Sequence, residues 1–316
     1  MNYFFRCCSA AVAVSFAVAS VSAAAAILPP PQKISEHAWA WIGPYEGPNM
    51  ANQGYRMNLG FVVGKNGVAV VDTGHTQEIA QEMLGYIRKI TAVPVRVAIN
   101  TNSQPHRFMG NEVFRKAGAR IIAGKEAAQR MSQDGGMFVA GVEQMFQRPA
   151  GSVKLPGPPD QLIAAGGSER IDLGGVSIDI RDYGRAHTRG SLVVLVEPDR
   201  TIFAGDILYS GRLPSVLPDS SVVGWLAAYD RLRTLDARLF VPGHGEPKPL
   251  AAFEHPTYAY LMALKRHMTQ QLKQGNDLGA ATASFDSSAW RGLANFEELA
   301  GRNASNAFVE LEADAF

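Results

Sequence analysis

A regular alternation of β-like and helix-like segments is the feature that most restricts how this chain can fold. Residues 60–74, "GFVVGKNGVAVVDTG", predict two strands joined by a turn, and residues 76–90 predict a helix whose apolar stripe includes Ile90. The alternation continues with a strand at 95–99, a short helix near 111–117 and a strand at 119–123. Strand–helix–strand order requires crossover connections, with helices packed against a sheet.

The second half of the chain repeats this order. The β-like segments "ERIDLGG", "VSIDIRDYG", "SLVVLVEP" and "TIFAGD" precede a helical stripe over 222–232, a further strand in "RLFVPGHG" and a mostly helical tail from Pro256. Because the order occurs twice, we predict an α/β fold of the αββα sandwich type, with two mixed β-sheets between helical layers. Residues 132–168, rich in Gly, Pro, Gln and Met, predict a long irregular surface segment that covers a site.

The N-terminus has the pattern of a secretory signal peptide over residues 1–23. Arg6 precedes an apolar run, and Val21-Ser22-Ala23 fits the small-x-small cleavage rule. A retained membrane anchor is the alternative, which we disfavour because the run is shorter than the roughly 20 residues that a span needs. Both cysteines of the chain, Cys7 and Cys8, lie in this segment, so the predicted mature protein has no thiol. We therefore expect a periplasmic or secreted protein.

Composition restricts the partners that the chain can have. The 316 residues include 30 Lys and Arg against 29 Asp and Glu, for a formal net charge of +1. Such a balance gives no electrostatic signature of nucleic-acid binding, and after signal cleavage we expect no membrane partner. We further predict a Pro-rich spacer at 24–35, one domain over 36–250, and a helical extension at 251–316 that packs on the same domain.

Metal-competent side chains follow the predicted strands. They are Asp72 in "VVDTG", the turn from Asn102 to Arg107, His187 in "AHTRGS", Asp206 in "FAGD" and His244 in "VPGHG". Strand ends meet at one rim of an open α/β sheet, where such folds build their sites. Taken singly, each signal is weak, because a His in a Gly-rich turn is often structural and an Asp often caps a helix. His75, beside a predicted helix start, is better interpreted as a neighbour of the cap than as a pocket residue.

Together these motifs resemble the metallo-β-lactamase fold over nearly all of the mature length. The resemblance is closest to the secreted zinc metallohydrolases named for quinoprotein relay systems, which occur beside PQQ-dependent alcohol dehydrogenases. The segments that carry it include "GFVVGKNGVAVVDTG", "VRVAINT", "GNEVF", "FAGDILYSGRLP", "GWLAAYDRLRTLDARLFVPGHG" and "NASNAFVELEADAF".

The first metal motif of that family, T-H-x-H-x-D-H, is degenerate in this chain. With Thr101 and Gly110 aligned, its four ligand positions hold Asn102, Gln104, His106 and Arg107. The later ligands His187, Asp206 and His244 are retained, and so is Asp72, which supports the first motif in the family. By the resemblance, an intact site would hold two zinc ions that activate a hydroxide for hydrolysis. Here His187 remains as a remnant of the first metal site.

Two chemical states of this site are consistent with the substitutions. His106, Asp206 and His244 form a two-His-one-carboxylate set able to hold one Zn²⁺ or Fe²⁺. Against this, Arg107 stays charged at any relevant pH and has no lone pair for a metal. Asp206 without its metals needs a counter-charge, so we predict an Arg107–Asp206 ion pair and favour a site with no metal cofactor.

Three functions follow from these states. The first is a pseudo-hydrolase that acts by binding a small-molecule ligand or a periplasmic protein, such as a quinoprotein dehydrogenase suggested by the resemblance. The second is a single-metal hydrolase that uses His106, Asp206 and His244. The third is an interaction module whose pocket plays no part. No catalytic residue is assigned, because a fold does not by itself transfer an activity.

Overall fold

Two mixed β-sheets form the centre of the protein. The computed structural model describes residue 1 and residues 26–313, so the predicted signal peptide lies outside the described residues apart from Met1. The first sheet has seven strands in chain order: β1 (Gln32–Lys33), β2 (Ala38–Trp41), β3 (Leu59–Val63), β4 (Val68–Val71), β5 (Val95–Asn100), β6 (Arg120–Gly124) and β7 (Gln161–Ile163). Strands β4 to β7 pair in parallel and the others antiparallel, which makes the sheet mixed.

The second sheet has five strands, ordered β12-β11-β10-β9-β8. They are β8 (Ser168–Asp172), β9 (Ser177–Asp182), β10 (Leu192–Val196), β11 (Thr201–Tyr209) and β12 (Leu239–His244). Only β11 and β12 pair in parallel. Apolar side chains from both sheets, among them Val71, Ile99, Ile180 and Val194, form one buried cluster between them.

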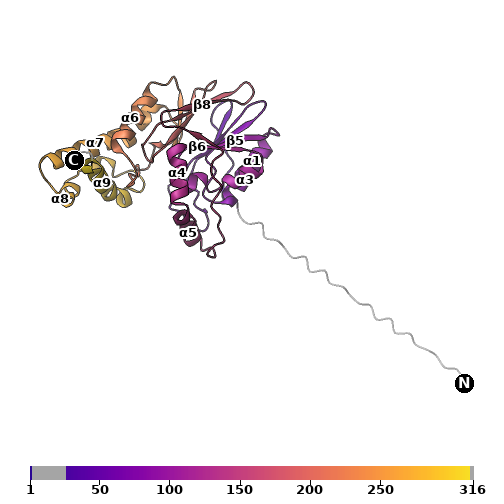
Figure 1. Cartoon of the computed structure of the whole chain (residues 1–316), viewed down its shortest axis with the longest axis horizontal. Coiled ribbons are helices and arrows are strands. Elements are labelled where there is room, and N and C mark those ends of the chain that lie inside the picture. The colour runs from indigo at the N-terminus through magenta and orange to yellow at the C-terminus, as the bar shows by residue number, and fades with distance from the viewer. Residues whose placement is uncertain (2–25, 314–316) are drawn as a thin grey trace.

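Helices cover the outer face of each sheet. On the first sheet, α1 (Gln77–Ile90) and α3 (Asn111–Lys116) pack in a cluster with strands β2 to β6. On the second, α6 (Val222–Arg233), α7 (Tyr260–Lys273) and α9 (Phe296–Ala313) share a cluster with β11. Figure 1 shows these two helical groups on opposite sides of the strands. The predicted αββα arrangement with two mixed sheets is confirmed.

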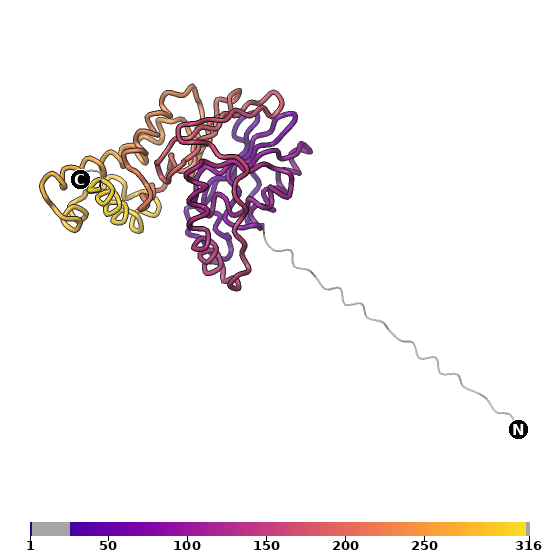
Figure 2. The backbone as a smooth tube through the Cα atoms, viewed as in Figure 1, coloured from indigo at the N-terminus to yellow at the C-terminus, as the bar shows by residue number. Residues whose placement is uncertain are grey.

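The C-terminal helices belong to the core of the second layer. Leu261 and Leu264 of α7 and Leu299 of α9 are fully buried in the same cluster as Trp225 of α6. The small helix α8 (Leu278–Ala283), two 3₁₀ helices at Leu250–Phe253 and Ser288–Trp290, and a π-helical segment at Glu254–Ala259 complete this region. Figure 2 shows the backbone of these helices, in orange and yellow, gathered at one end of the molecule. No helix within residues 26–313 combines the length and the apolar character needed to cross a membrane.

The prediction of an irregular segment over residues 132–168 is wrong where helix and strand residues form, which is less than half of the stretch. This stretch completes α4 (Lys125–Gln133) and contains α5 (Gly135–Met145) and strand β7. The glycines of "GGMFVAGVEQM" weaken the helical pattern, but Phe138 and Val142 are buried against α4 and Phe108, and this packing outweighs the low propensity. Ile90, predicted on the buried stripe of α1, is 40% exposed because the helix ends there.

Candidate functional site

The predicted strand-end residues meet at one rim of the sheets. Asp72 follows β4 directly and has φ 60°, a left-handed conformation that costs a residue with a side chain about 1 kcal/mol or more. This conformation places its carboxylate within reach of Thr101, the residue after β5. The backbone N–H of Thr101 donates to Asp72 over 2.7 Å, and its hydroxyl donates over 2.8 Å. The two strand ends are therefore joined by a buried carboxylate.

Arg107 lies at the centre of the rim, on the short helix α2 (Pro105–Phe108), and is 1% exposed. Its Nη2 donates to Asp206 Oδ1 over 2.7 Å and its Nε to Asp206 Oδ2 over 3.1 Å. Its Nη1 donates to Asp72 Oδ2 and to the carbonyl of Asn58, both over 2.9 Å. The last N–H of Nη2 donates to the carbonyl of Gly243 over 3.3 Å. All five guanidinium donors are thus used.

The predicted Arg107–Asp206 ion pair is present, and it is bidentate. The additional pair with Asp72 was not predicted. The amide of Asn102 also donates to Asp206 Oδ2 over 2.7 Å, so both oxygens of Asp206 accept from N–H groups. Burial alone would raise the pKa of Asp206, but the charge of Arg107 outweighs it and holds this pKa well below the ordinary value. Burial raises the pKa of Asp72 to about 6, although Arg107 acts in the opposite direction.

Two of the family histidines, His187 and His244, form hydrogen bonds within the protein. His244 Nδ1 lies 2.8 Å from the carbonyl of Arg56 and must donate to it, which leaves Nε2 to accept from Arg212 Nη1 over 3.0 Å. His187 Nε2 lies 2.7 Å from the side-chain oxygen of Gln104 and donates to it. Burial lowers the pKa of His187 to about 4, so the ring is neutral at physiological pH.

These contacts do not suit a metal ion at the rim. Zinc needs lone pairs that converge, yet those of Asp206 and of His244 Nε2 point at guanidinium N–H groups. Arg107 already pairs with Asp206, the one carboxylate of the candidate ligand set, and with Asp72 beside it. Moreover, His106, Asp206 and His244 do not form a compact ligand set. Their ligand atoms do not all lie within 4.8 Å of one another, as a preformed site requires.

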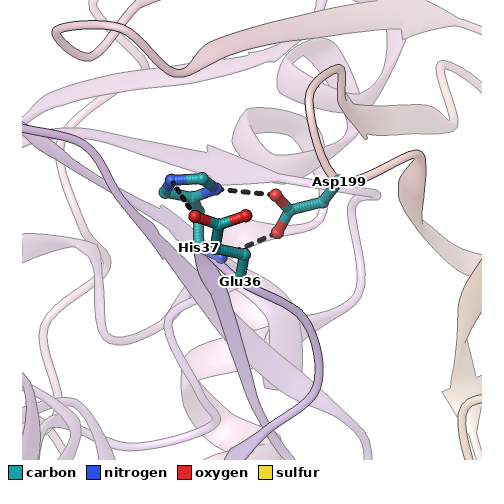
Figure 3. Close-up of side chains that lie close together, drawn as sticks. All are labelled: Glu36, His37 and Asp199. Atoms are coloured by element: carbon teal, nitrogen blue, oxygen red, sulfur yellow. Dashed lines mark hydrogen bonds and ion pairs between the residues drawn. The ribbon is translucent and has the colours of Figure 1, made fainter.

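Within residues 26–313, only one set of His and acidic residues has its ligand atoms all within 4.8 Å of one another, and it lies away from the rim. It consists of Glu36, His37 and Asp199. Figure 3 shows His37 between the two carboxylates. His37 Nδ1 contacts Asp199 Oδ1 over 2.7 Å, and the His37 backbone N–H donates to Asp199 Oδ2 over 2.8 Å. These bonds, with one from Ser35, fasten the β1–β2 turn to the β10–β11 turn. The group is therefore a structural link between the two sheets.

A cavity of about 320 Å³ opens beside the rim. Four of the predicted site residues line it, namely Gln104, His106, His187 and His244. The other four, Asp72, Asn102, Arg107 and Asp206, are buried in the adjoining network. The structure thus brings all eight predicted residues together, in two layers.

Several residues of the cavity wall were missed by the sequence analysis. Arg56, Arg212, Glu298 and Arg302 contribute charges, and α5 contributes an apolar wall with Met137, Phe138, Val142 and Met145. His75 does precede the helix cap Thr76, as predicted, but it is also buried and lines the cavity, which was the less favoured interpretation. Arg212, six residues after Asp206 in "GDILYSGRLP", was the one local signal available.

Comparison with known proteins agrees with this fold. Residues 56–244 match the family model of the Metallo-beta-lactamase superfamily, and the chain belongs to that superfamily. A metallo-beta-lactamase from Pontibacter korlensis superposes with TM-score 0.59 at 20% identity, covering 73% of this chain and 98% of its own. VMB-1, in a crystal structure at pH5.5, has TM-score 0.57 at 16% identity, covering 74% and 96%. The DIM-1 metallo-beta-lactamase has TM-score 0.56 at 15% identity, covering 74% and 98%. At these identities the likeness shows the fold alone.

Proposed function

We propose that this protein is a metal-free pseudo-hydrolase that acts by binding. The observation that carries the proposal is the guanidinium of Arg107, which bonds to Asp72 and Asp206 and uses its remaining donors on two backbone carbonyls. A fixed +1 charge about 4 Å from a dication costs about 8 kcal/mol at an effective dielectric near 20. The guanidinium supplies the counter-charge that a superfamily metal centre would supply, without generating a hydroxide.

The single-metal hydrolase is the less supported function. It requires His244 Nε2 to give up its bond from Arg212, and Asp206 to give up three N–H donors. His106 does keep a buried Nε2 that has no hydrogen-bond partner within residues 26–313, so one ligand of the set is free. One free imidazole is too few for a structural or catalytic zinc site, which takes three or four protein ligands.

Element analysis of the purified protein tests the proposal directly. Untagged protein is equilibrated with zinc, dialysed and measured by plasma mass spectrometry. We expect well under a tenth of an equivalent of metal. We also expect that nitrocefin and an activated ester are hydrolysed no faster than by a zinc-loaded control protein that lacks this fold. About one equivalent of tightly held zinc or iron, with hydrolysis that a chelator abolishes, would overturn the proposal.

The location and partner of the protein are further parts of the proposal. We infer export to the periplasm or medium from the signal-peptide pattern of residues 1–23. The resemblance to the quinoprotein relay proteins supports a role beside a PQQ-dependent dehydrogenase, as a binder of a small molecule or of the enzyme. Fractionation tests the first point: deletion of residues 2–23 should retain the protein in the cytoplasm. For the second, the purified protein should bind the purified dehydrogenase in calorimetry, and an absence of heat at micromolar concentration contradicts it.

A further inference from the structure

Two arginines of the cavity, Arg56 and Arg212, have guanidinium groups that form no ion pair with any residue in 26–313. The side chain of Arg56 is half-buried, and its guanidinium makes no hydrogen bond or ion pair with any described residue. Arg212 is 5% exposed, makes one bond from Nη1 to His244, and has a buried Nε with no partner. Buried donors without partners are rare in proteins and need an explanation.

The two unmet charges are also neighbours. Burial lowers the pKa of Arg56, and the positive charge of Arg212 lowers it further, whereas Glu298 and Asp206 act more weakly in the opposite direction. Like charges held together in a half-buried wall destabilise the empty protein, and an anion placed between them would relieve this. The fold therefore holds an electrostatic cost at this wall that a ligand can remove.

The carboxylates of the rim cannot serve as that anion. Asp206 and Asp72 are already paired with Arg107, and both oxygens of Asp206 accept from other groups. Of the charged residues that line the cavity, Arg56, Arg212 and Arg302 are positive and Glu298 is negative, so the lining carries a net charge of +2 (three minus one). The lining histidines add no charge near neutral pH.

The part of the cavity wall formed by α5 is apolar. Helix α5 presents Met137, Phe138, Val142 and Met145 to the cavity. Met137 is 63% exposed and Met145 is 39% exposed, so large flexible apolar side chains remain in contact with solvent at the entrance. Methionine adapts its shape to varied apolar ligands, and a volume of about 320 Å³ lies at the small end of ligand pockets.

We propose that the cavity binds a small amphiphilic organic anion, with its anionic head between Arg56 and Arg212 and its apolar body against α5. This inference rests on the proposed binding function and names the ligand class of the same site. The guanidinium groups supply paired donors that match a carboxylate, and the methionine wall excludes water from the apolar part.

Calorimetry with a matched pair of probes tests the inference. The purified, untagged protein is titrated with 4-phenylbutanoate and with 4-phenylbutanamide, which share the apolar body and differ in charge. We expect the carboxylate to bind at least tenfold more tightly than the amide, and its affinity to fall as salt is raised. Equal affinities, or no heat from either probe at millimolar concentration, overturn the inference.

A pair of substitutions locates the charge that matters. Arg56→Met removes a guanidinium that has no partner among the described residues, so it leaves no broken bond inside the protein. It should weaken 4-phenylbutanoate binding at least tenfold and leave the amide unchanged. Arg266→Met, on the exposed face of α7, removes the same charge away from the cavity and should change neither affinity. Equal effects of the two substitutions overturn the assignment, and circular dichroism confirms that both variants are folded.

Metal content measured on the same sample separates this inference from the proposed function. Charge-selective binding that depends on Arg56, in a protein that also holds an equivalent of zinc, refutes the metal-free function and leaves the ligand class standing. No zinc and no charge-selective binding refutes the ligand class alone. Charge-selective binding that disappears with a chelator assigns the anion to a metal and overturns both.

Discussion

Replacement of Arg107 by methionine should destabilise the protein strongly at neutral pH. Arg107 makes five hydrogen bonds, three of them to carboxylates that are at most 2% exposed. Methionine has a similar length but offers no donor, so the charges of Asp72 and Asp206 would lose their shared counter-charge. Removing one partner of a buried ion pair typically costs about 3–5 kcal/mol.

The cost has an upper limit for each carboxylate, because the group can take up a proton instead of staying charged. With an unfolded-state pKa of about 3.9, protonation near pH 7.5 costs about 5 kcal/mol, and near pH 5.5 about 2 kcal/mol. When the pKa of a carboxyl is raised in the folded state, the free energy of unfolding falls as pH rises through that window. The destabilisation by Arg107→Met should therefore shrink by about 3 kcal/mol between these two pH values for each carboxylate that takes up a proton.

Urea unfolding of the wild type and of Arg107→Met at the two pH values measures this difference. The compensating variant that adds Asp72→Asn and Asp206→Asn should recover part of the stability near pH 7.5, because no buried charge remains. Arg266→Met serves as the control for loss of a positive charge. A loss below about 1 kcal/mol, or a loss that is equal at both pH values, would refute the argument that Arg107 neutralises the rim.

Three further predictions concern the same region. The first of them restores the family motif with the substitutions Asn102→His, Gln104→His, His106→Asp and Arg107→His. The resulting protein should retain at least one equivalent of zinc after dialysis. Wild-type stability should fall as pH drops below about 6.5, because burial lowers the pKa of four histidines: His75, His106, His187 and His244. Each contributes about 1.4 kcal/mol per pH unit until its own pKa in the folded state is reached. Asp72 offsets one of them below about pH 6, and in urea titrations His75→Asn should flatten the slope. Gly243→Ala should cost about 1–3 kcal/mol in thermal unfolding, since its Cβ would lie 2.1 Å from Asp206 Oδ1 and 2.8 Å from Arg107 Nη2; an unchanged midpoint contradicts the tight packing there.

The fold could be predicted because local patterns and global topology agree. The strands flanking the turn at 64–67 and the helix that begins after Thr76 lie within a residue or two of their predicted limits. Helix α5 could not be predicted in this way, because its glycines lower helix propensity and its stability comes from packing on α4 and Phe108. That packing is a tertiary property with no local signature.

The site was predictable only where it follows strand ends. Asp72 follows β4, His187 lies in the β9–β10 connection and His244 ends β12, whereas Asp206, predicted to end its strand, lies inside β11 beside the register shift at Gly205. The Arg107–Asp206 pair follows from the donors of arginine and the needs of a buried carboxylate. The cationic wall depends on long-range contacts instead. Arg212 meets His244 across 32 residues, and Arg302 of α9 meets Ser215 across 87. Such pairings are set by how loops and C-terminal helices dock, which a single sequence does not encode locally.

The residues around Arg107 supply an acceptor for every donor of its guanidinium, and this limits what the rest of the cavity can bind. Two of its five donors need neutral acceptors, which are the carbonyls of Asn58 and Gly243, and Gly243 has no side chain that would displace the pair. With every donor satisfied, Arg107 has no donor left for a ligand, and both oxygens of Asp206 accept from N–H groups, so neither residue bonds to Arg56 or Arg212. The guanidinium groups of the outer wall therefore stay available to a ligand. A metal ion at the rim would have to displace Arg107, whose guanidinium would then need other acceptors. The state of the inner layer thus determines what the outer layer can bind.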